Sequence, residues 1–300
     1  MANNNKSSKI GAGTIFGIVI GLFVLVSVIA IIVNANHKPD PNVLTKKSPT
    51  HPHTFGYSPD GRTLWIGTHT GMYEYNGGKW IRTVPAIADN DVMGYYVNAN
   101  EPKVMYISGH GFVKRTEDGG ASWKPIENGM PNAPKPDVPD AHILAQDPND
   151  SKHLYVFLVQ QENNVYETTD GGDTWNLAGT IAPDAYSMSV APGGNALLVA
   201  SEAGLRQYSF GQNKNEVIAY VDKPVYYTYT LPAGEVIIYG SEGFRRSRDF
   251  KTWEPIGIDL GGEQPIGLRA SHADPNRLAV VTFDYSVYES ADGGNTWDQK

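Results

Sequence analysis

Two sets of side chains that can hydrogen-bond, exchange protons or ligate a metal recur at fixed places along this 300-residue sequence. The first set lies six residues before a recurring proline, where we predict that a strand begins: His53, Tyr96, His142, Tyr186, Tyr226 and Arg269. The second set lies at predicted short turns: His69, His110, Glu162, Glu202, Glu242 and Asp284. No member of the first set is aliphatic, and every member of the second can ionise. We therefore predict a ligand site where the two sets meet.

These side chains suit three kinds of chemistry. Imidazoles favour zinc or copper, and five could converge on an ion: His51, His53, His69, His110 and His142. The carboxylates of the second set could supply the acid pair of a glycoside hydrolase. Tyrosine, histidine and arginine on rigid strands could instead hold a protein, peptide or glycan without turnover. The plainest interpretation is that polar residues line a wet channel and solvated turns. We predict a non-enzymatic binding or assembly module, with the hydrolase and the metal site as alternatives.

The elements that position these residues come from a repeat. Three octapeptides match closely, TEDGGASW at 116–123, TTDGGDTW at 168–175 and SADGGNTW at 290–297, and we call this motif the Asp box. SRDFKTW at 247–253 and YNGGKW at 75–80 are degraded copies. The Asp and Trp residues of the four clearer copies are Asp118, Trp123, Asp170, Trp175, Asp249, Trp253, Asp292 and Trp297. One further unit without its Trp fits between 175 and 253, which gives about six units of roughly 40–50 residues, the period of propeller blades.

The Asp box is typical of a tight turn between two strands. Its Asp can accept hydrogen bonds from turn amides, glycine allows a positive φ, and the Trp buries a large ring as the next strand begins. We therefore predict that these carboxylates are structural and not catalytic. Residues 53–300 are predicted to form an all-β propeller of about six blades. Disulfides have no part in it, because the chain has no cysteine.

The N-terminal segment has a different character. Residues 10–34 carry no charge, and as a helix they would exceed the ~30 Å hydrocarbon core of a membrane. Lys6 and Lys9 precede them, so residues 1–9 are predicted to stay in the cytoplasm. We predict a transmembrane helix over 10–34, a linker over 35–52 and a propeller outside the cell membrane, with a cleaved signal peptide as the alternative. The net charge of −8 argues against nucleic acid as a partner.

The stretch PDAHILAQDPNDSKHLYVFLVQQENNVYETTDGGDTW, at 139–175, carries a family resemblance together with the Asp boxes. It resembles the Asp-box (BNR-repeat) propeller superfamily of sialidases, sortilin-type receptors and photosystem II assembly factors. It is most similar to bacterial membrane-anchored members labelled sialidase-like glycosyl hydrolases. The resemblance implies that the first strand of each blade lines a central channel and that ligands favour the face away from the Asp boxes.

The resemblance also implies what a sialidase would require. Such an enzyme uses three arginines on the substrate carboxylate, a tyrosine nucleophile with a glutamate partner, and an acid aspartate. The family's Arg-Ile-Pro motif is missing from the first blade, and Arg269 is the one arginine in the predicted ring. We therefore do not expect true sialidase activity, and if the chain is an enzyme we predict another glycoside hydrolase.

Overall fold

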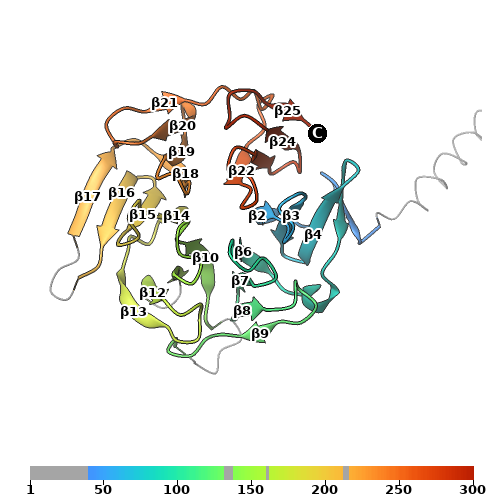
Figure 1. The fold of residues 1–300 in the computed structure, drawn as a ribbon, viewed down its shortest axis with the longest axis horizontal. Helices are drawn as coiled ribbons and strands as arrows, with labels where there is room; N and C mark the ends of the chain where they lie inside the picture. Colours follow the sequence, from blue (N-terminus) through green and yellow to red (C-terminus); the bar gives the residue numbers. More distant parts are fainter. Residues whose placement is uncertain (1–39, 132–137, 160–161, 212–215) are drawn as a thin grey trace, which may run out of the picture. The chain divides into compact units, whose positions relative to one another are not determined.

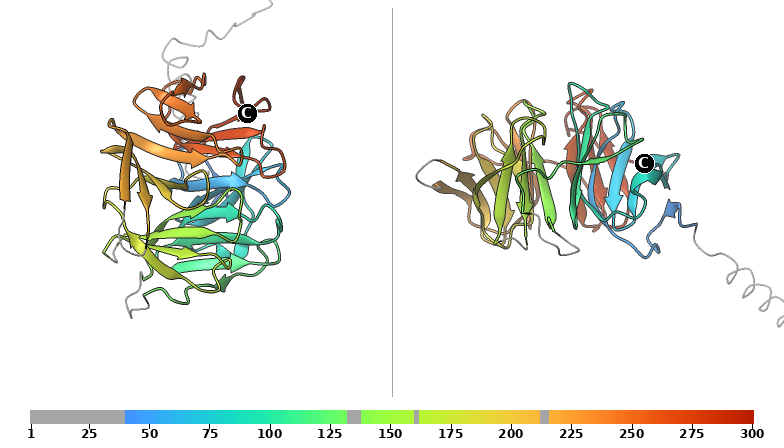
Figure 2. Two further views of the ribbon diagram at one scale, coloured as in Figure 1. Left: turned by 60° about the vertical axis from the view of Figure 1, so that its left-hand side comes forward. Right: turned by 90° about the horizontal axis from the view of Figure 1, so that it is seen from below.

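The chain folds into a ring of antiparallel sheets. The computed structural model describes residues 40–131, 138–159, 162–211 and 216–300. Asn42–Lys300 form one compact unit, in which six sheets surround a common axis (Figure 1). Figure 2 shows the strands running roughly along that axis. The predicted all-β propeller of six blades is confirmed.

Each blade is a contiguous segment whose strands pair in chain order from the axis outwards. Blade one comprises β2 (Pro52–Tyr57), β3 (Leu64–Thr68), β4 (Gly71–Asn76) and β5 (Lys79–Arg82). Blade two comprises β6 (Val92–Val97), β7 (Met105–Gly109), β8 (Phe112–Thr116) and β9 (Lys124–Pro125). Blade three comprises β10 (Ala141–Gln146), β11 (Leu154–Leu158), β12 (Asn164–Thr168) and β13 (Asn176–Thr180). Blade four comprises β14 (Ser187–Val190), β15 (Leu197–Ser201), β16 (Gly204–Ser209) and β17 (Glu216–Val221). Blade five comprises β18 (Val225–Thr230), β19 (Val236–Gly240), β20 (Gly243–Ser247) and β21 (Glu254–Pro255). Blade six comprises β22 (Pro265–Ala270), β23 (Leu278–Thr282), β24 (Val287–Ser290) and β25 (Asp298–Gln299). One 3-10 turn, η1 (Pro85–Ile87), lies between blades one and two.

The hydrophobic core is divided among the contacts between neighbouring blades. On β3, Leu64 and Ile66 belong to a cluster shared with blade six, whereas Trp65 between them belongs to one shared with blade two. Successive side chains point to opposite faces of a strand, so a strand packed on both faces must be apolar throughout. All six clusters of buried residues found in the described ranges combine two adjacent blades. A blade therefore completes its core only beside its neighbours.

Blade six meets blade one without a shared strand in the described part of the chain. The indole Nε1 of Trp80 donates to the carbonyl of Tyr285 at 2.9 Å. The hydroxyl of Ser271 donates to the carbonyl of Gly61 at 2.8 Å. Both bonds cross from one blade to the other beside their common apolar cluster. The ring is therefore closed by side chains.

A short extra strand, β1 (Val43–Leu44), pairs with β5 at the outer edge of blade one. Its Leu44 is buried in the cluster shared by blades one and six. The predicted linker over 35–52 therefore needs correction, since its residues from Asn42 onward belong to the compact unit. The predicted cytoplasmic segment and transmembrane helix fall on residues 1–39, outside the described ranges. Within those ranges, no helix is long and apolar enough to span a membrane.

The Asp boxes form self-contained turns between the third and fourth strands of their blades. In the turn after β12, Asp170 Oδ1 accepts hydrogen bonds from the Thr168 hydroxyl at 2.7 Å and the Thr174 amide at 3.0 Å. Its Oδ2 accepts one from the Thr174 hydroxyl at 2.6 Å. Gly171 and Gly172 have φ values of 79° and 91°, a region that favours glycine. The same pattern recurs around Asp118 and Asp292.

The tryptophans of the boxes do not all have the same role. Trp175 is 2% exposed, and its Nε1 donates across the blade boundary to the carbonyl of Ile126 at 2.7 Å. Trp123 and Trp297 bond within their own turns, to the carbonyls of Gly120 and Gly294. Trp175 therefore joins blade three to blade two, whereas the other two stabilise a turn.

We predict that Trp175→Ala lowers the free energy of unfolding by about 3–5 kcal/mol, because it empties a fully buried site between two blades. Trp123→Ala is the matched control, since its ring is partly exposed and bonds locally. It should cost clearly less. Chemical denaturation of both variants measures this difference, and equal losses would contradict the distinction between the two tryptophans.

Acid should weaken the Asp boxes. The amide and hydroxyl of Thr296 hydrogen-bond to Asp292 and lower its pKa to about 2, against about 3.9 in an unfolded chain. As the pH falls, the Asp292 carboxylate therefore takes up a proton in the unfolded chain before it does so in the folded protein. The stability that this carboxylate supplies is present above about pH 4 and is lost as the pH falls towards 2. Denaturation curves between those values should show a shallower pH slope for Asp292→Asn than for the wild type. An identical slope would show that this carboxylate does not titrate as the geometry requires.

Candidate functional site at the channel mouth

The innermost strands share an irregularity where they begin. In five blades the pairing with the second strand skips one residue there, which is a β-bulge. The residues at the bulge are His53, Met93, His142, Tyr226 and Ile266. Tyr186, directly before β14, holds the equivalent place in blade four, where its amide donates to the Ala200 carbonyl. A bulge frees a side chain from the regular alternation of the strand, and these six residues line one end of the channel.

This ring corrects the predicted one at two positions. Tyr96 and Arg269 are the fifth residues of β6 and β22, and the bulge positions of their blades hold Met93 and Ile266. The prediction counted back from the proline of the loop after the strand. Pro102 and Pro275 stand three residues further along their loops than the other four prolines do. Alignment on the apolar second strands would have given the right residues.

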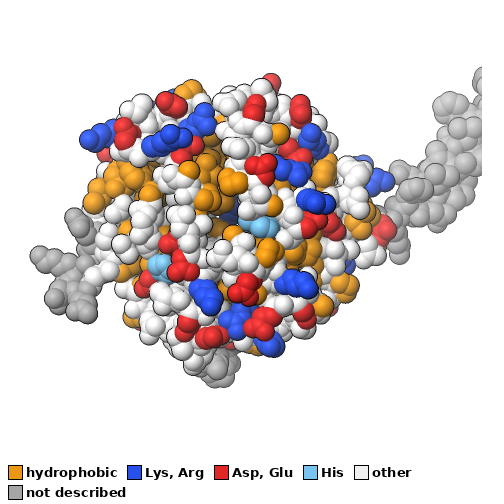
Figure 3. All heavy atoms as spheres, viewed as in Figure 1, with side chains coloured by type: hydrophobic (Ala, Val, Ile, Leu, Met, Phe, Trp, Pro, Cys, Tyr) orange, Lys and Arg blue, Asp and Glu red, His pale blue; other side chains and the backbone are white. Residues whose placement is uncertain are grey.

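A cavity of about 720 Å³ opens at this mouth. Among the described residues its lining combines histidine, tyrosine, glutamine and apolar side chains, and it includes no Asp or Glu. A cavity of about 100 Å³ shares His53, His142, Tyr186 and Tyr226 with the mouth and has Arg269 in its lining. Figure 3 shows that the surface is also hollowed at the ring axis on the face that it views. The mouth lies at the end of the channel where each blade turns from its second to its third strand. The Asp boxes lie between the third and fourth strands, so they are at the opposite end of the channel.

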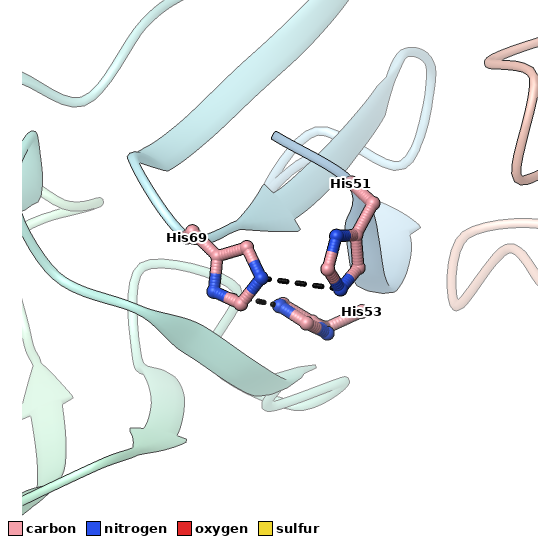
Figure 4. A group of neighbouring side chains, drawn as sticks. All are labelled: His51, His53 and His69. Atoms are coloured by element: carbon pink, nitrogen blue, oxygen red, sulfur yellow. Dashed lines mark hydrogen bonds between the residues drawn. The ribbon is translucent and has the colours of Figure 1, made fainter. Parts of the chain in front are cut away.

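One side of the mouth is a histidine wall, which we define as His51, His53, His69, Asp91, His110, Asp140 and His142. Its first part gathers three imidazoles from blade one, and their rings converge (Figure 4). His53 Nε2 lies 3.2 Å from His69 Nδ1. His69 Nε2 lies 3.1 Å from His51 Nε2. The three ring centroids are 4.3–4.7 Å apart. The start of β2 and the turn after β3 thus bring three potential metal ligands together.

The second part of the histidine wall comes from blades two and three. Asp140 Oδ1 lies 2.8 Å from His110 Nδ1 and 2.9 Å from His142 Nε2. Asp91 connects the two parts, because its Oδ2 lies 2.7 Å from His69 Nδ1 and 3.7 Å from His110 Nε2. The structure therefore places the five histidines in two neighbouring groups that Asp91 connects.

Burial keeps the inner histidines uncharged. It lowers the pKa of His53 to about 4, against the pull of the nearby Asp91 carboxylate. Burial also lowers the pKa of His142, which Asp140 opposes in the same way. Near pH 7 both imidazoles are neutral and each keeps a lone pair. The histidine wall thus presents neutral nitrogen donors beside two carboxylates.

The other side of the mouth is an aromatic wall, which we define as Tyr186, Tyr226, Tyr239 and Phe283. The Tyr186 and Tyr226 rings are 5.9 Å apart, and the Tyr226 and Tyr239 rings 6.4 Å. The Tyr186 hydroxyl donates to Glu202 at 2.9 Å, which fixes that ring. Since these residues come from blades four to six, the aromatic wall faces the histidine wall across the mouth.

The predicted carboxylate pair does not form at the mouth. Glu242 pairs with Lys223 at 3.2 Å, and Asp284 pairs with Lys46 at 3.1 Å. Glu162 is exposed in a left-handed turn position, with φ of 59°. None of the four predicted acids, which are Glu162, Glu202, Glu242 and Asp284, is among the described residues that line the mouth cavity. Acids at equivalent turn positions therefore have different partners, since Glu202 accepts a hydrogen bond from Tyr186 while Glu242 and Asp284 pair with lysines.

Two acidic residues of the histidine wall escaped the sequence prediction. Asp91 and Asp140 each stand directly before an innermost strand, β6 and β10. His51 stands directly before β2 in the same way. The position before the first strand therefore contributes to the site in blades one to three. The repeat thus carries a signal at the position directly before the strand, which the prediction did not include.

Arg269 lies deeper in the channel. Its guanidinium lies 5.2 Å from the Tyr96 ring centroid and 4.9 Å from that of Tyr229. It donates to the Tyr227 hydroxyl, which donates in turn to the Leu268 carbonyl. Arg269 and Tyr96 also line a common cavity of about 120 Å³. Arg269 and Tyr96 are therefore parts of the channel interior rather than of the mouth ring.

Comparison with known proteins supports the fold. The sequence matches no family model and no curated protein. The solved structure of YCF48 bound to a D1 peptide aligns over 88% of this chain and 85% of its own, with 17% identity and a TM-score of 0.51. A GH74 enzyme of Niastella koreensis aligns over 86% of this chain and 46% of its own, with 17% identity and a TM-score of 0.57. A gluconolactonase-family propeller aligns over 86% and 92%, with 12% identity and a TM-score of 0.61. At these identities the likeness is one of fold.

Proposed function

We propose that this chain is a non-enzymatic binding module whose channel mouth takes a segment of another protein. The observation that carries the proposal is the aromatic wall. Tyr186, Tyr226 and Phe283 are 47%, 43% and 51% exposed at the edge of a concave cavity. Large aromatic side chains exposed around a hollow are typical of residues that a partner covers.

The physical basis of binding is a rigid surface. Tyr226 belongs to a paired strand, and Glu202 holds the Tyr186 hydroxyl, so both rings are largely ordered before a ligand arrives. Little conformational entropy is then lost on binding. Tyrosine also combines a large apolar face with a polar end, which makes it frequent among the residues that dominate binding energy. A cavity of about 720 Å³ accommodates a few side chains of an extended peptide.

The comparisons contain precedents for both peptide binding and glycoside hydrolysis, and the lining of the cavity favours binding. YCF48 with its D1 peptide shows that a propeller of this fold can hold a peptide. The GH74 enzyme shows that the fold also serves glycoside hydrolysis, which in most families needs two carboxyl groups across the sugar. The described lining of the mouth cavity contains no carboxyl group, and the two carboxylates of the histidine wall, Asp91 and Asp140, face imidazoles. The Asp boxes support membership of the Asp-box superfamily, within which we propose a binder.

We further propose that residues 10–34 anchor the chain in the cell membrane and that the propeller lies on the extracytoplasmic side. The uncharged run supports the anchor, and Lys6 and Lys9 before it support a cytoplasmic N-terminus.

A peptide-display library provides the test. We expect the immobilised protein to select peptides whose affinity falls at least tenfold, or about 1.4 kcal/mol, in Tyr186→Ala and in Tyr226→Ala. Leu177→Ala is the control, because Leu177 is 57% exposed but lies on the outer strand β13. The titrations are run with a chelator present, so that the result is independent of metal ions.

Two results would contradict the proposed function. One is a selection that yields no peptide, or peptides whose affinity ignores both tyrosines. The other is turnover of a glycan that survives purification and disappears in a single carboxylate variant such as Glu202→Gln, which would establish a hydrolase instead.

A further inference from the structure

We propose that the histidine wall binds two neighbouring divalent transition-metal ions, with Zn²⁺ the best match. The first centre is His51, His53 and His69, the second is His110, Asp140 and His142, and Asp91 is shared between them. In each centre the three potential ligand atoms lie within 4.8 Å of one another. This inference is independent of the proposed peptide binding, which uses the opposite wall.

The spacing in the first centre suits a tetrahedral ion. Ligand nitrogens bound to zinc at about 2.0–2.1 Å are separated from one another by about 3.3–3.4 Å in a tetrahedron. The His53–His69 and His69–His51 nitrogen separations of 3.2 and 3.1 Å are close to that value. His69 turns a different nitrogen to each neighbour, so it must rotate slightly to give one nitrogen to the ion. His51 and His69 are exposed and have room for that rotation.

The second centre is deeper and contains a carboxylate. The side chain of Asp140 is 2% exposed, and its Oδ1 is within 2.9 Å of an imidazole nitrogen on each side. His142 Nε2 is shielded from solvent and faces the Asp140 carboxylate at 2.9 Å. A cation bound between these groups would accept the lone pair of that nitrogen together with a carboxylate oxygen.

Asp91 is placed to serve both ions. Its Oδ2 faces His69 of the first centre and His110 of the second. Its Oδ1 is shielded from solvent and has no hydrogen bond within the described residues, although His53 Nε2 lies 3.4 Å away. A carboxylate between two cations can give one oxygen to each, as in two-metal sites. The two carboxylates of the wall, Asp91 and Asp140, supply oxygen ligands beside the five imidazoles.

The donor set selects the class of ion. Imidazole nitrogen with a minority of carboxylate oxygen suits zinc, copper, nickel or iron, whereas calcium and magnesium prefer oxygen ligands. No thiolate competes for the ion, because the chain has no cysteine. We therefore expect tight binding of Zn²⁺ and Co²⁺ and none of Mg²⁺ at the same concentration.

The test is metal stoichiometry of the full-length protein in detergent after removal of bound metal with a chelator. Calorimetric titration with Zn²⁺, checked by elemental analysis after gel filtration, should give two equivalents per chain. His69→Ala should lose one equivalent and His142→Ala the other, while Asp91→Asn should weaken both by at least tenfold. Co²⁺ should give visible absorption bands of four-coordinate ions that His69→Ala roughly halves.

The other histidines of the propeller provide controls. His153→Ala and His272→Ala, which lie outside the histidine wall, should leave stoichiometry and affinity unchanged. His142→Gln replaces His142→Ala if circular dichroism shows that the alanine variant does not fold. Absence of Zn²⁺ binding at 100 μM, or binding that persists in both His69→Ala and His142→Ala, would overturn the inference. A wild-type stoichiometry of only one equivalent, abolished by His69→Ala and equally by His142→Ala, would overturn the two-centre form.

Discussion

The structure depends on one packing constraint: no blade of this propeller has a hydrophobic core of its own. Leu64 and Ile66 on one face of β3 require blade six, and Trp65 on the other face requires blade two. The apolar surface of each blade is removed from water only when the ring is complete, and this burial is the main favourable term in folding. Closing the ring therefore has to be cooperative. The hydrogen bonds across the seam between blades six and one orient a contact that is mainly hydrophobic.

The same constraint explains where the site can vary. Side chains within β2 or β10 that face neighbouring blades are committed to packing, whereas the bulge residue at the start of the strand projects into the channel. This residue is histidine in blades one and three, tyrosine in blade five and isoleucine in blade six. His53 and Tyr226 occupy the same place in their blades yet belong to walls of different chemistry. A repeated scaffold thus carries a site that does not repeat.

The features of the fold that follow from the repeat could be predicted from the sequence. The Asp boxes and apolar second strands are local patterns with a fixed period, so the blade number and the turn positions of His69 and His110 followed from them. The ring was predicted correctly where loop length is constant and wrongly at Tyr96 and Arg269, because a proline inside a loop does not mark the register of the strand before it. Asp91 and Asp140 were missed because the prediction considered a position within the first strand and not the position directly before it. The pairing of Glu242 and Asp284 with lysines could not be predicted, because it depends on contacts between segments that no repeat pattern records.

The outer strand β1 has a mechanical consequence. It is the first described strand, and two residue pairs hold it to β5. Lys46, just beyond it, reaches Glu263 and Asp284 of blade six through exposed ion pairs. A pulling force applied to the chain before Asn42 therefore acts on this edge before it reaches any inner strand. β1 should peel away from β5 while the seam bonds of Trp80 and Ser271 remain intact. The propeller would then gain several residues of slack without opening, so tension on the N-terminal side would lengthen the chain and leave the shape of the channel mouth unchanged.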